Sequence, residues 1–425
     1  MRIAIFTDVY LEIPGGIPSS IKAQKSALEA LGHQVTIFCP GWAKSLDPTI
    51  NVVPTHPLFR PNRVPLAKRP QKILHFIEQK YPNFNTHFDL IHVHYEASCS
   101  IAGVKLAKKY RLKLFQTMHG REDIAIDANL PSPMKYFVAF TLNFLHRTSL
   151  SNLQPKSFLK SNNPPSTKPT RSLSTIQRDN FLIKNSVCQN MWEIMVRQAN
   201  QADLVISPTQ HFAKNLKHYG VRPSIHVISN GIDDQQLQKY TFKPLPFHHK
   251  SSLRIIWSSR LSKEKRILPF LKAVSKSKNL HRIKLTIIGE GNQTQEAKNF
   301  ASKHFSAKQI TFLGLIPHEQ IFKYMQKQHL SVINSYGFDT QGMTILEAVA
   351  CGLPVLYADP AMDEVVPQNG GLRAKDDSIA AMTAQIDYIF EHPEIIQQMS
   401  QTIASSRHLV LESTQIKRLL QLYQL

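Results

Sequence analysis

Residues 2–39 read RIAIFTDVYLEIPGGIPSSIKAQKSALEALGHQVTIFC, and this stretch predicts the fold of the first half of the chain. Residues 2–7 form a short apolar run with β-branched side chains, which is typical of a buried strand. A glycine turn at Gly15 and Gly16 leads into an amphipathic stretch, residues 20–31, that ends at a glycine as helices often do. A second strand follows at 35–39, so the segment predicts a βαβ unit.

The same alternation continues along the 425 residues, and it implies parallel sheets with helices on both faces. The first half adds strands at 90–93, 113–117, 204–207 and 225–228 and helices at 101–110 and 188–200. A second series adds strands at 253–257, 284–288, 310–313, 330–333 and 354–357 and helices at 268–275, 293–303, 318–328 and 342–350. We therefore predict an α/β protein with two doubly wound, Rossmann-like domains, residues 1–225 and 226–400, and a C-terminal helix at 401–425 that packs back on the first domain.

The charge of the chain is strongly basic, with a formal net charge of +21. Up to residue 225 there are 28 Lys and Arg against 13 Asp and Glu, a net of +15, and the remainder carries 23 against 17, a net of +6. Such an excess suggests nucleic acid, anionic lipid or a charged polymer as partner, or a basic surface without one. Without an aromatic-basic recognition motif, nucleic acid is disfavoured.

The cellular location is predicted from the cysteines and the apolar runs. Four cysteines without C-x-x-C spacing favour neither a zinc site nor a disulfide framework and fit a reducing compartment. The N-terminus does not read as a signal peptide, since its apolar run soon meets Asp8 and Glu12. The most lipid-like run, 136–145, is far shorter than the ~20 residues of a membrane helix. We expect a cytoplasmic protein, soluble or peripheral on the inner face of the cell membrane.

Two basic segments stand out in the first half. Residues 148–185 are rich in Ser, Asn, Pro and cations and predict a mobile surface insertion, with or without a function. Residues 57–72, PLFRPNRVPLAKRPQK, mix cations with apolar side chains and contain no acid. This mixture suits an anionic bilayer surface, although a basic loop without a lipid partner would look the same. The predicted acceptor and membrane residues are Arg60, Arg63, Lys68, Arg69 and Lys72.

Residues 334–354, NSYGFDTQGMTILEAVACGLP, carry the sharpest site signal. They follow a predicted strand, pass a glycine-containing loop and open a helix near Gly342. A helix N-terminus presents free N–H groups and a positive dipole end, which suit a nucleotide diphosphate. Glu347, inside the helix, can accept hydrogen bonds from a ribose diol, and Asp339, in the loop, can hold sugar hydroxyls.

This segment resembles the E-x7-E signature of the family 4 retaining glycosyltransferases, which have the GT-B fold. Further motifs occur in the order typical of that family: PGGI at 14–17, LGHQVT at 31–36, DLIHVH at 89–94, TMHG at 117–120, NGID at 230–233 and SRLSKEK at 259–265. The resemblance implies two domains that face each other across a cleft and hold a nucleotide-sugar there. It also implies retention of the anomeric configuration without a metal or other cofactor.

The resemblance implies roles for individual residues. Asp339, Glu347 and His119 would be catalytic, with His119 touching the transferred sugar or the acceptor. Arg260 and Lys265, after a strand of the second domain, could neutralise the diphosphate and replace a divalent metal; there is no D-x-D tripeptide. The other predicted donor-binding residues are Gly16, Gly342, Met343 and Thr344.

Three positions depart from the family pattern. Asp339 stands where the family has Glu, which puts the identity of the donor sugar in question. Ser259 and Arg266 replace glycines on either side of the second-domain basic motif, and Arg266 would add a cation beside the diphosphate or point to solvent.

The sequence therefore predicts a hexosyltransferase that moves a hexose from UDP-glucose or a similar nucleotide-sugar to a membrane lipid such as diacylglycerol, or to another cell-envelope acceptor. A wall polysaccharide, teichoic acid or protein acceptor remains open, as do an epimerase, a phosphorylase and a non-catalytic partner subunit. The absence of G-x-G-x-x-G after the first strand disfavours NAD.

Overall fold

The computed structural model describes residues 1–13, 15–56, 65–153, 185–240, 242 and 244–425. The chain forms two compact units. The first unit is Met1–Leu11 with Leu31–Val227, and the second is Glu12–Ala30 with Ile228–Leu425. The division after Val227 lies two residues from the predicted boundary, whereas Glu12–Ala30, which the predicted boundaries place in the first domain, groups with the second unit.

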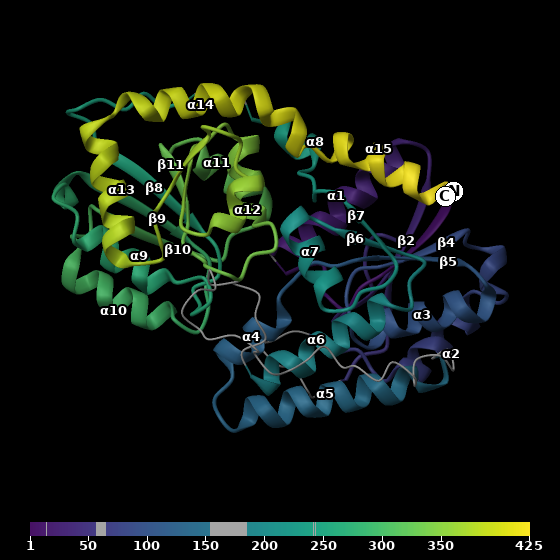
Figure 1. Cartoon of the computed structure of the whole chain (residues 1–425). Coiled ribbons are helices and arrows are strands. Elements are labelled where there is room, and N and C mark those ends of the chain that lie inside the picture. Colours follow the sequence, from purple (N-terminus) through teal and green to yellow (C-terminus); the bar gives the residue numbers. More distant parts are fainter. Residues whose placement is uncertain (14, 57–64, 154–184, 241, 243) are drawn as a thin grey trace. The chain divides into compact units, whose positions relative to one another are not determined.

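The first unit is built on a seven-stranded parallel sheet in the order β3-β2-β1-β4-β5-β6-β7 (Figure 1). Its strands are β1 (Arg2–Phe6), β2 (Gln34–Pro40), β3 (Ile50–Val53), β4 (Leu90–Val93), β5 (Lys113–Thr117), β6 (Leu204–Ser207) and β7 (Ser224–Val227). The strand order reverses between β1 and β4. Ligands of such sheets bind beyond the carboxyl ends of the strands at this switch point.

Helices cover this sheet and bury a continuous core against it. They are α2 (Pro70–Lys80), α3 (Ser98–Tyr110), α4 (Glu122–Asn129), α5 (Met134–Leu150), α6 (Ser186–Ala199) and α7 (Gln210–His218). The sequence predicted α3 and α6 but missed α2, α4, α5, α7 and the strand β3. α5 was missed because its apolar residues lie all round the helix, so they show no amphipathic period. The predicted insertion at 148–185 falls mostly on residues 154–184, outside the described residues.

The second unit holds a six-stranded parallel sheet in the order β10-β9-β8-β11-β12-β13. Its strands are β8 (Leu253–Ser258), β9 (Ile283–Ile288), β10 (Ile310–Gly314), β11 (Leu330–Ile333), β12 (Val355–Tyr357) and β13 (Gly371–Arg373). Five of these strands were predicted within a residue or two. The three-residue edge strand β13 was missed, because so short a segment shows no period.

Two core clusters hold the helices of the second unit on its sheet (Figure 1). One gathers side chains of α9 (Ile267–Ser275), α10 (Thr294–His304) and α13 (Ile379–Glu391). The other gathers α11 (His318–Met325) and α12 (Met343–Ala350). The unit is completed by α1 (Gly16–Ala30), α8 (Asp234–Leu237), α14 (Glu394–Ser406) and α15 (Glu412–Tyr423).

The C-terminal helix α15 packs on α1, where the amide of Gln24 donates to the hydroxyl of Tyr423 at 3.1 Å. The described residues contain no helix that is both long and apolar enough to cross a bilayer.

Candidate functional site

The loop between β11 and α12 shapes the main site of the second unit. Gly342 lies in the left-handed region with φ of 74°, a conformation that a side chain would strain, and the helix begins directly after it at Met343. The buried carboxylate of Asp359 accepts the N–H of Gly337 at 2.6 Å and so anchors the loop. The predicted helix N-terminus is therefore present at Met343, directly after a backbone turn that requires the glycine.

Glu347 lies in the second turn of α12 and is 4% exposed. Its carboxylate is 2.7 Å from Nε2 of His318, the first residue of α11. Burial by itself lowers the pKa of His318, but the hydrogen bond and the charge of Glu347 outweigh it and raise that pKa above its ordinary value. The pair thus orients the carboxylate. No sequence motif indicated His318, because it lies 29 positions before Glu347 in the chain.

Asp339 and Lys265, predicted separately from two motifs, form an ion pair of 2.5 Å. The hydroxyl of Ser335 donates to the second carboxylate oxygen of Asp339, and the ammonium of Lys265 lies 4.9 Å from the ring centre of Phe338. Both charged side chains are mostly buried, with 17% of the surface of Lys265 and 11% of that of Asp339 exposed. The structure therefore brings the predicted sugar carboxylate and the predicted diphosphate cation into direct contact.

Arg260 is the more open of the two predicted cations. Its side chain is 59% exposed and lies 3.3 Å from the buried carboxylate of Glu264, which also accepts the hydroxyl of Ser262 at 2.7 Å. The guanidinium can therefore reach an incoming anion while Glu264 restrains it. Glu264 lies within the motif at 259–265 but was not among the predicted site residues.

Arg266 occupies a left-handed position with φ of 63°, immediately before α9. This conformation explains why the family pattern has a glycine there. Its guanidinium is 3.3 Å from the carboxylate of Asp377. Arg266 therefore pairs with a neighbouring acid, and that contact accounts for its charge.

Three more predicted donor residues meet around the start of α12. A Cβ at Gly16 would lie 2.8 Å from Cγ of Met343, so the side chain of Met343 packs directly against the backbone of Gly16. The hydroxyl of Thr344 donates to the carbonyl of Ser258 at 2.8 Å and ties α12 to the end of β8. These predicted donor residues therefore also have structural contacts: Gly16 with Met343, and Thr344 with the end of β8.

The amide of Gln341 links the signature loop to the NGID motif. Its oxygen accepts the backbone N–H of Asn230 at 3.1 Å and the side-chain amide of Asn230 at 2.6 Å, and its nitrogen donates to Ser229 at 2.6 Å. Asn230 also accepts the hydroxyl of Ser20 on α1 at 2.7 Å. These contacts give the T-Q-G part of the signature a positioning role.

The first unit carries a histidine cluster at the ends of β4 and β5. Nδ1 of His94 lies 2.9 Å from Nε2 of His119, and Nε2 of His92 lies 2.8 Å from the hydroxyl of Thr117. Burial lowers the pKa of His119 to about 4 and, with the charge of His119, that of His92 to about 3. Burial likewise lowers the pKa of His94. All of these rings are therefore neutral at pH 7.

The hydrogen bonds of this cluster favour one tautomer. Among the described residues, the buried Nε2 of His94 has no hydrogen-bond partner. Orphaned N–H groups are rarer than unpaired acceptors, so the proton of His94 belongs on Nδ1, which then donates to Nε2 of His119. His119 consequently carries its own proton on Nδ1 and can donate from that nitrogen.

Two half-buried acids follow the neighbouring strands β1 and β4. Asp8, just after β1, accepts backbone N–H groups at the start of α3, from Cys99 at 2.6 Å and Ser100 at 3.0 Å, and burial raises its pKa. Burial and the charges of Glu122 and Asp8 raise the pKa of Glu96 to about 8, although the amide of Gln116 donates to it at 3.3 Å. Asp8 thus caps α3, and the raised pKa of Glu96 favours its protonated form near neutral pH.

The predicted membrane residues are only partly described. Arg60 and Arg63 fall within 57–64, outside the described residues. Arg69 directly precedes α2 and is exposed, Lys72 lies exposed on the first turn of α2, and Lys68 is half-buried.

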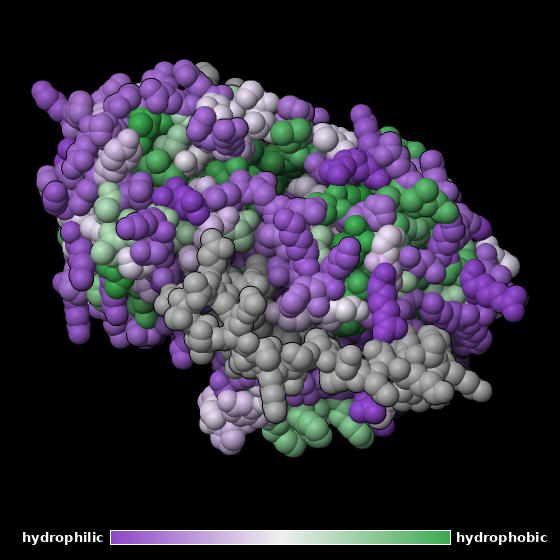
Figure 2. All heavy atoms as spheres, in the orientation of Figure 1, coloured by the Kyte–Doolittle hydropathy of each residue, from purple (hydrophilic) through white to green (hydrophobic). Residues whose placement is uncertain are grey.

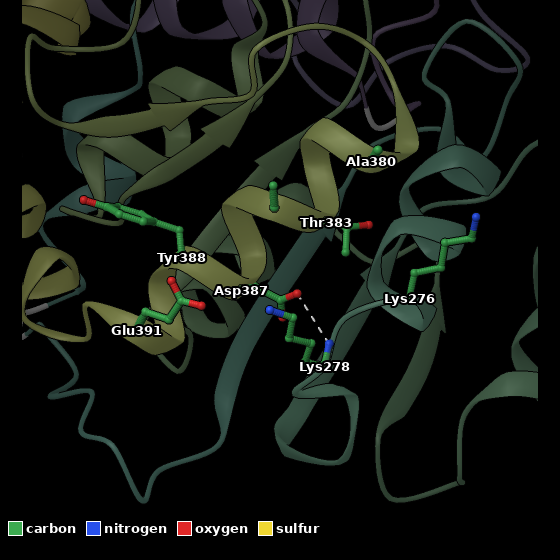
Figure 3. Close-up of a pocket in the computed structure, with 8 residues that line it drawn as sticks. Lys276, Lys278, Ala380, Thr383, Asp387, Tyr388 and Glu391 are labelled. Atoms are coloured by element: carbon green, nitrogen blue, oxygen red, sulfur yellow. Dashed lines mark hydrogen bonds between the residues drawn. The ribbon is translucent and has the colours of Figure 1, made fainter.

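The second unit also has a surface pocket beside α13 (Figure 3). One of its two carboxylates, that of Asp387, accepts the hydroxyl of Ser277 at 2.6 Å and the N–H of Lys278 at 3.4 Å, so it holds the turn after α9. The pocket is lined by Lys276, Lys278, Ala380, Thr383, Ala384, Asp387, Tyr388 and Glu391. None of the predicted site residues lines it, and we assign it no part in the chemistry.

Two family models match the chain. The model described as Glycosyltransferase Family 4 matches residues 14–153 and 183–236, and that described as Glycosyl transferases group 1 matches residues 242–405. Between residues 14 and 405 only 154–182 and 237–241 are left unmatched.

Relatives with similar sequences span most of the chain. An alpha-monoglucosyldiacylglycerol synthase of Acholeplasma laidlawii is 23% identical over 408 residues, 94% of this chain and 91% of that protein. A protein of the same name from Streptococcus pneumoniae is 22% identical over 387 residues, 86% of this chain and 73% of that protein.

Solved structures share the fold. Sucrose-phosphate synthase of Thermosynechococcus elongatus aligns with a TM-score of 0.70 at 16% identity, covering 100% of this chain and 98% of the other. HepE of Anabaena, in complex with UDP and glucose, aligns with a TM-score of 0.66 at 15% identity and covers 100% and 99%. The two sheets, the motif order and both family models agree: the chain belongs to the family 4 glycosyltransferases of GT-B fold and is a hexosyltransferase.

Proposed function

We propose that this enzyme transfers a hexose from UDP-glucose or a similar nucleotide-sugar to a membrane lipid such as diacylglycerol, with retention of the anomeric configuration. The observation that carries the proposal is the start of α12, where Glu347 is oriented by His318 and Asp339 is paired with Lys265. The enzyme would work in the cytoplasm, peripheral on the inner face of the cell membrane.

The second unit would bind the donor. Glu347 would accept hydrogen bonds from the ribose diol, and the N–H groups at the start of α12 would face the diphosphate. Because Lys265 and Asp339 contact each other, the donor would divide this pair, with Lys265 turning to the diphosphate and Asp339 to the sugar hydroxyls. The solved structure with UDP and glucose supports a uridine nucleotide as donor.

The departing UDP gains negative charge as the glycosidic bond breaks. Arg260, Lys265 and the dipole of α12 would stabilise that charge in place of a divalent cation. Such fixed positive groups need little reorganisation during the reaction, so we propose that transfer needs no metal and no other cofactor.

His119 of the first unit would donate its Nδ1 proton to a hydroxyl of the transferred sugar or the acceptor. Its lowered pKa, about 4, keeps the ring neutral at the pH of the cytoplasm.

The lipid acceptor is supported by the two alpha-monoglucosyldiacylglycerol synthases among the relatives. The basic excess of the first half supports an anionic membrane surface as the place where the acceptor is met.

The test is a donor-by-acceptor screen. Purified protein would be incubated with UDP-glucose, UDP-galactose or UDP-N-acetylglucosamine and with diacylglycerol vesicles, a wall polymer or no acceptor. Mass spectrometry identifies the product and proton NMR its anomeric configuration. We expect an α-linked glucosyl lipid from UDP-glucose. An inverted linkage, a product only with wall polymer, or no release of UDP under any condition would each overturn the corresponding part of the proposal.

A further inference from the structure

Helix α5 exposes an unusual number of large apolar side chains on the first unit. Figure 2 shows hydrophobic atoms along the lower edge of the view, where Figure 1 draws this helix. Phe137 is 71% exposed, Phe140 63% and Phe144 56%. The other exposed apolar residues of the helix are Met134, Tyr136, Leu142 and Leu145.

The three phenylalanines form a stripe on the outward side of the helix. Their spacing of three and four residues places them on one face. The opposite face holds Ala139, His146 and Leu150, which are buried, and Ala139 packs in a small core with Val187, Met191 and Ile194. α5 is therefore fixed to α6 by its inner face, and its aromatic face is left without a partner among the described residues.

The three phenylalanines alone expose a sizeable apolar patch. Three aromatic side chains of roughly 200 Å², each a little over half exposed, leave on the order of 350–400 Å² of apolar surface. This lies within the range of the largest apolar patch of a monomer, a patch that is often functional.

The charge around α5 favours an anionic surface. The 17 residues of the helix contain no acid, and Arg147 is exposed in its last turn. Lys135 lies in the first turn and is paired with Asp127 at 2.7 Å. Glu193 of α6 accepts a hydrogen bond from the side-chain amide of Asn143, and Asn143 is not part of the outward stripe. Aromatic and aliphatic side chains on one side, with cations and no acids on the helix, are the composition of helices that lie in the plane of a membrane interface.

We propose that α5 lies in the interface of an anionic bilayer, with Phe137, Phe140 and Phe144 among the acyl chains. This inference rests on the lipid acceptor of the proposed function, because it holds the first unit at the surface in which such an acceptor is dissolved. It differs from purely electrostatic attachment, since apolar insertion persists when salt screens the charges.

The test compares two triple variants in flotation with phosphatidylglycerol-rich vesicles at low and high salt. F137S/F140S/F144S should lose at least about tenfold in vesicle partitioning at high salt, because it removes apolar contact area. The control L46S/L315S/L409S changes three exposed leucines elsewhere and should change partitioning less than about twofold. A second arm places tryptophan in the stripe: Phe140→Trp should be quenched by brominated lipids more strongly than the wild type.

The outcomes separate the occupants of the face. Unchanged flotation of the phenylalanine variant, or no added quenching in Phe140→Trp, would overturn the proposal. Wild-type dimers that the phenylalanine substitutions abolish, without vesicle binding, would assign the face to a second copy instead. If the triple variant fails to fold, the quenching arm alone decides. Neither the flotation arm nor the quenching arm contains a donor or an acceptor, so a negative result would overturn only the membrane insertion of α5. The proposed function is tested separately, by a transfer assay with detergent-dispersed diacylglycerol.

Discussion

Glu347 is a buried carboxylate held by one histidine, and the proposed ribose contact depends on its charge. Glu347→Gln keeps the shape of the side chain but weakens hydrogen bonds to a diol and to His318. We expect transfer to fall at least about tenfold, with a thermal midpoint close to that of the wild type. Glu391→Gln, which changes an exposed acid on α13, should transfer at the wild-type rate. If the Glu347→Gln enzyme retains more than half of the activity, the role is excluded.

The raised pKa of Glu96 should be visible in how the stability of the protein depends on pH. Its pKa of about 8 exceeds the ordinary 4.5, so the folded chain binds more protons there than the unfolded chain. The stability that this group contributes is therefore lost as pH rises from about 4.5 towards 8. His92 and His119, with lowered pKa values of about 3 and 4, act oppositely and remove stability as pH falls below about 6.5.

Glu96→Gln isolates the first of these effects, since Gln stays neutral at every pH. We expect its thermal midpoint to exceed that of the wild type by several degrees at pH 8 and by clearly less at pH 5. Differential scanning fluorimetry at the two pH values measures the difference. Equal shifts at both would mean that Glu96 is ionised in the folded protein.

Among the elements, α1 and α12 pack closely because Gly16, the first residue of α1, has no side chain to clash with Met343 of α12. A Cβ at Gly16 would meet Cγ of Met343 at 2.8 Å, whereas a Cβ at Gly15 would meet Pro18 at an ordinary 3.6 Å. The start of α12 is the proposed diphosphate site. Displacing it by a few tenths of an ångström should therefore weaken donor binding.

We expect Gly16→Ala to raise the KM for the nucleotide-sugar about tenfold, and Gly15→Ala to leave it near the wild-type value. Met343→Ala removes the clashing atom, so the double variant with Gly16→Ala should recover part of the loss. This non-additivity is measured by a double-mutant cycle. Strictly additive effects would show that the contact is not the cause.

At the level of the whole molecule, the positions of the fixed cations bear on whether the reaction needs a divalent metal. Because Arg260, Lys265 and the α12 terminus supply positive charge at the proposed diphosphate site, transfer should survive excess EDTA. UDP release, followed with and without the chelator, measures this. Activity lost to EDTA and restored by magnesium or manganese would contradict the proposal of metal independence.

The basic excess of the first half should bind the protein to anionic membranes in a salt-dependent way. Exchanging Arg60, Arg63, Lys68, Arg69 and Lys72 for Gln should weaken flotation with phosphatidylglycerol vesicles at low salt, since screening acts over about 10 Å at 0.1 M. The KM for the nucleotide-sugar should be unchanged, because the proposed donor site lies in the second unit. Equal binding of wild type and variant at low salt would show that these cations do not contribute to membrane binding.

The sequence by itself determined most of the strands and many of the helices, and it predicted site roles for Asp339, Glu347, Lys265 and Gly16. A buried strand or an amphipathic helix is written in neighbouring residues, and the signature motifs are contiguous. The short strands β3 and β13 and the apolar helix α5 have no such period, and they form where packing supports them.

Only the tertiary structure decided which charges meet. Lys265 and Asp339 are 74 residues apart, and His318 and Glu347 are 29 apart, so their contacts depend on how strands β8 and β11 lie side by side in the sheet and how α11 packs near α12. The ion pair of Arg266 with Asp377, the tautomer of His119 and the aromatic face of α5 are also not encoded in the spacing of the motifs. Backbone dihedral angles, burial and the neighbours of a side chain are set by long-range packing, and no local pattern encodes them.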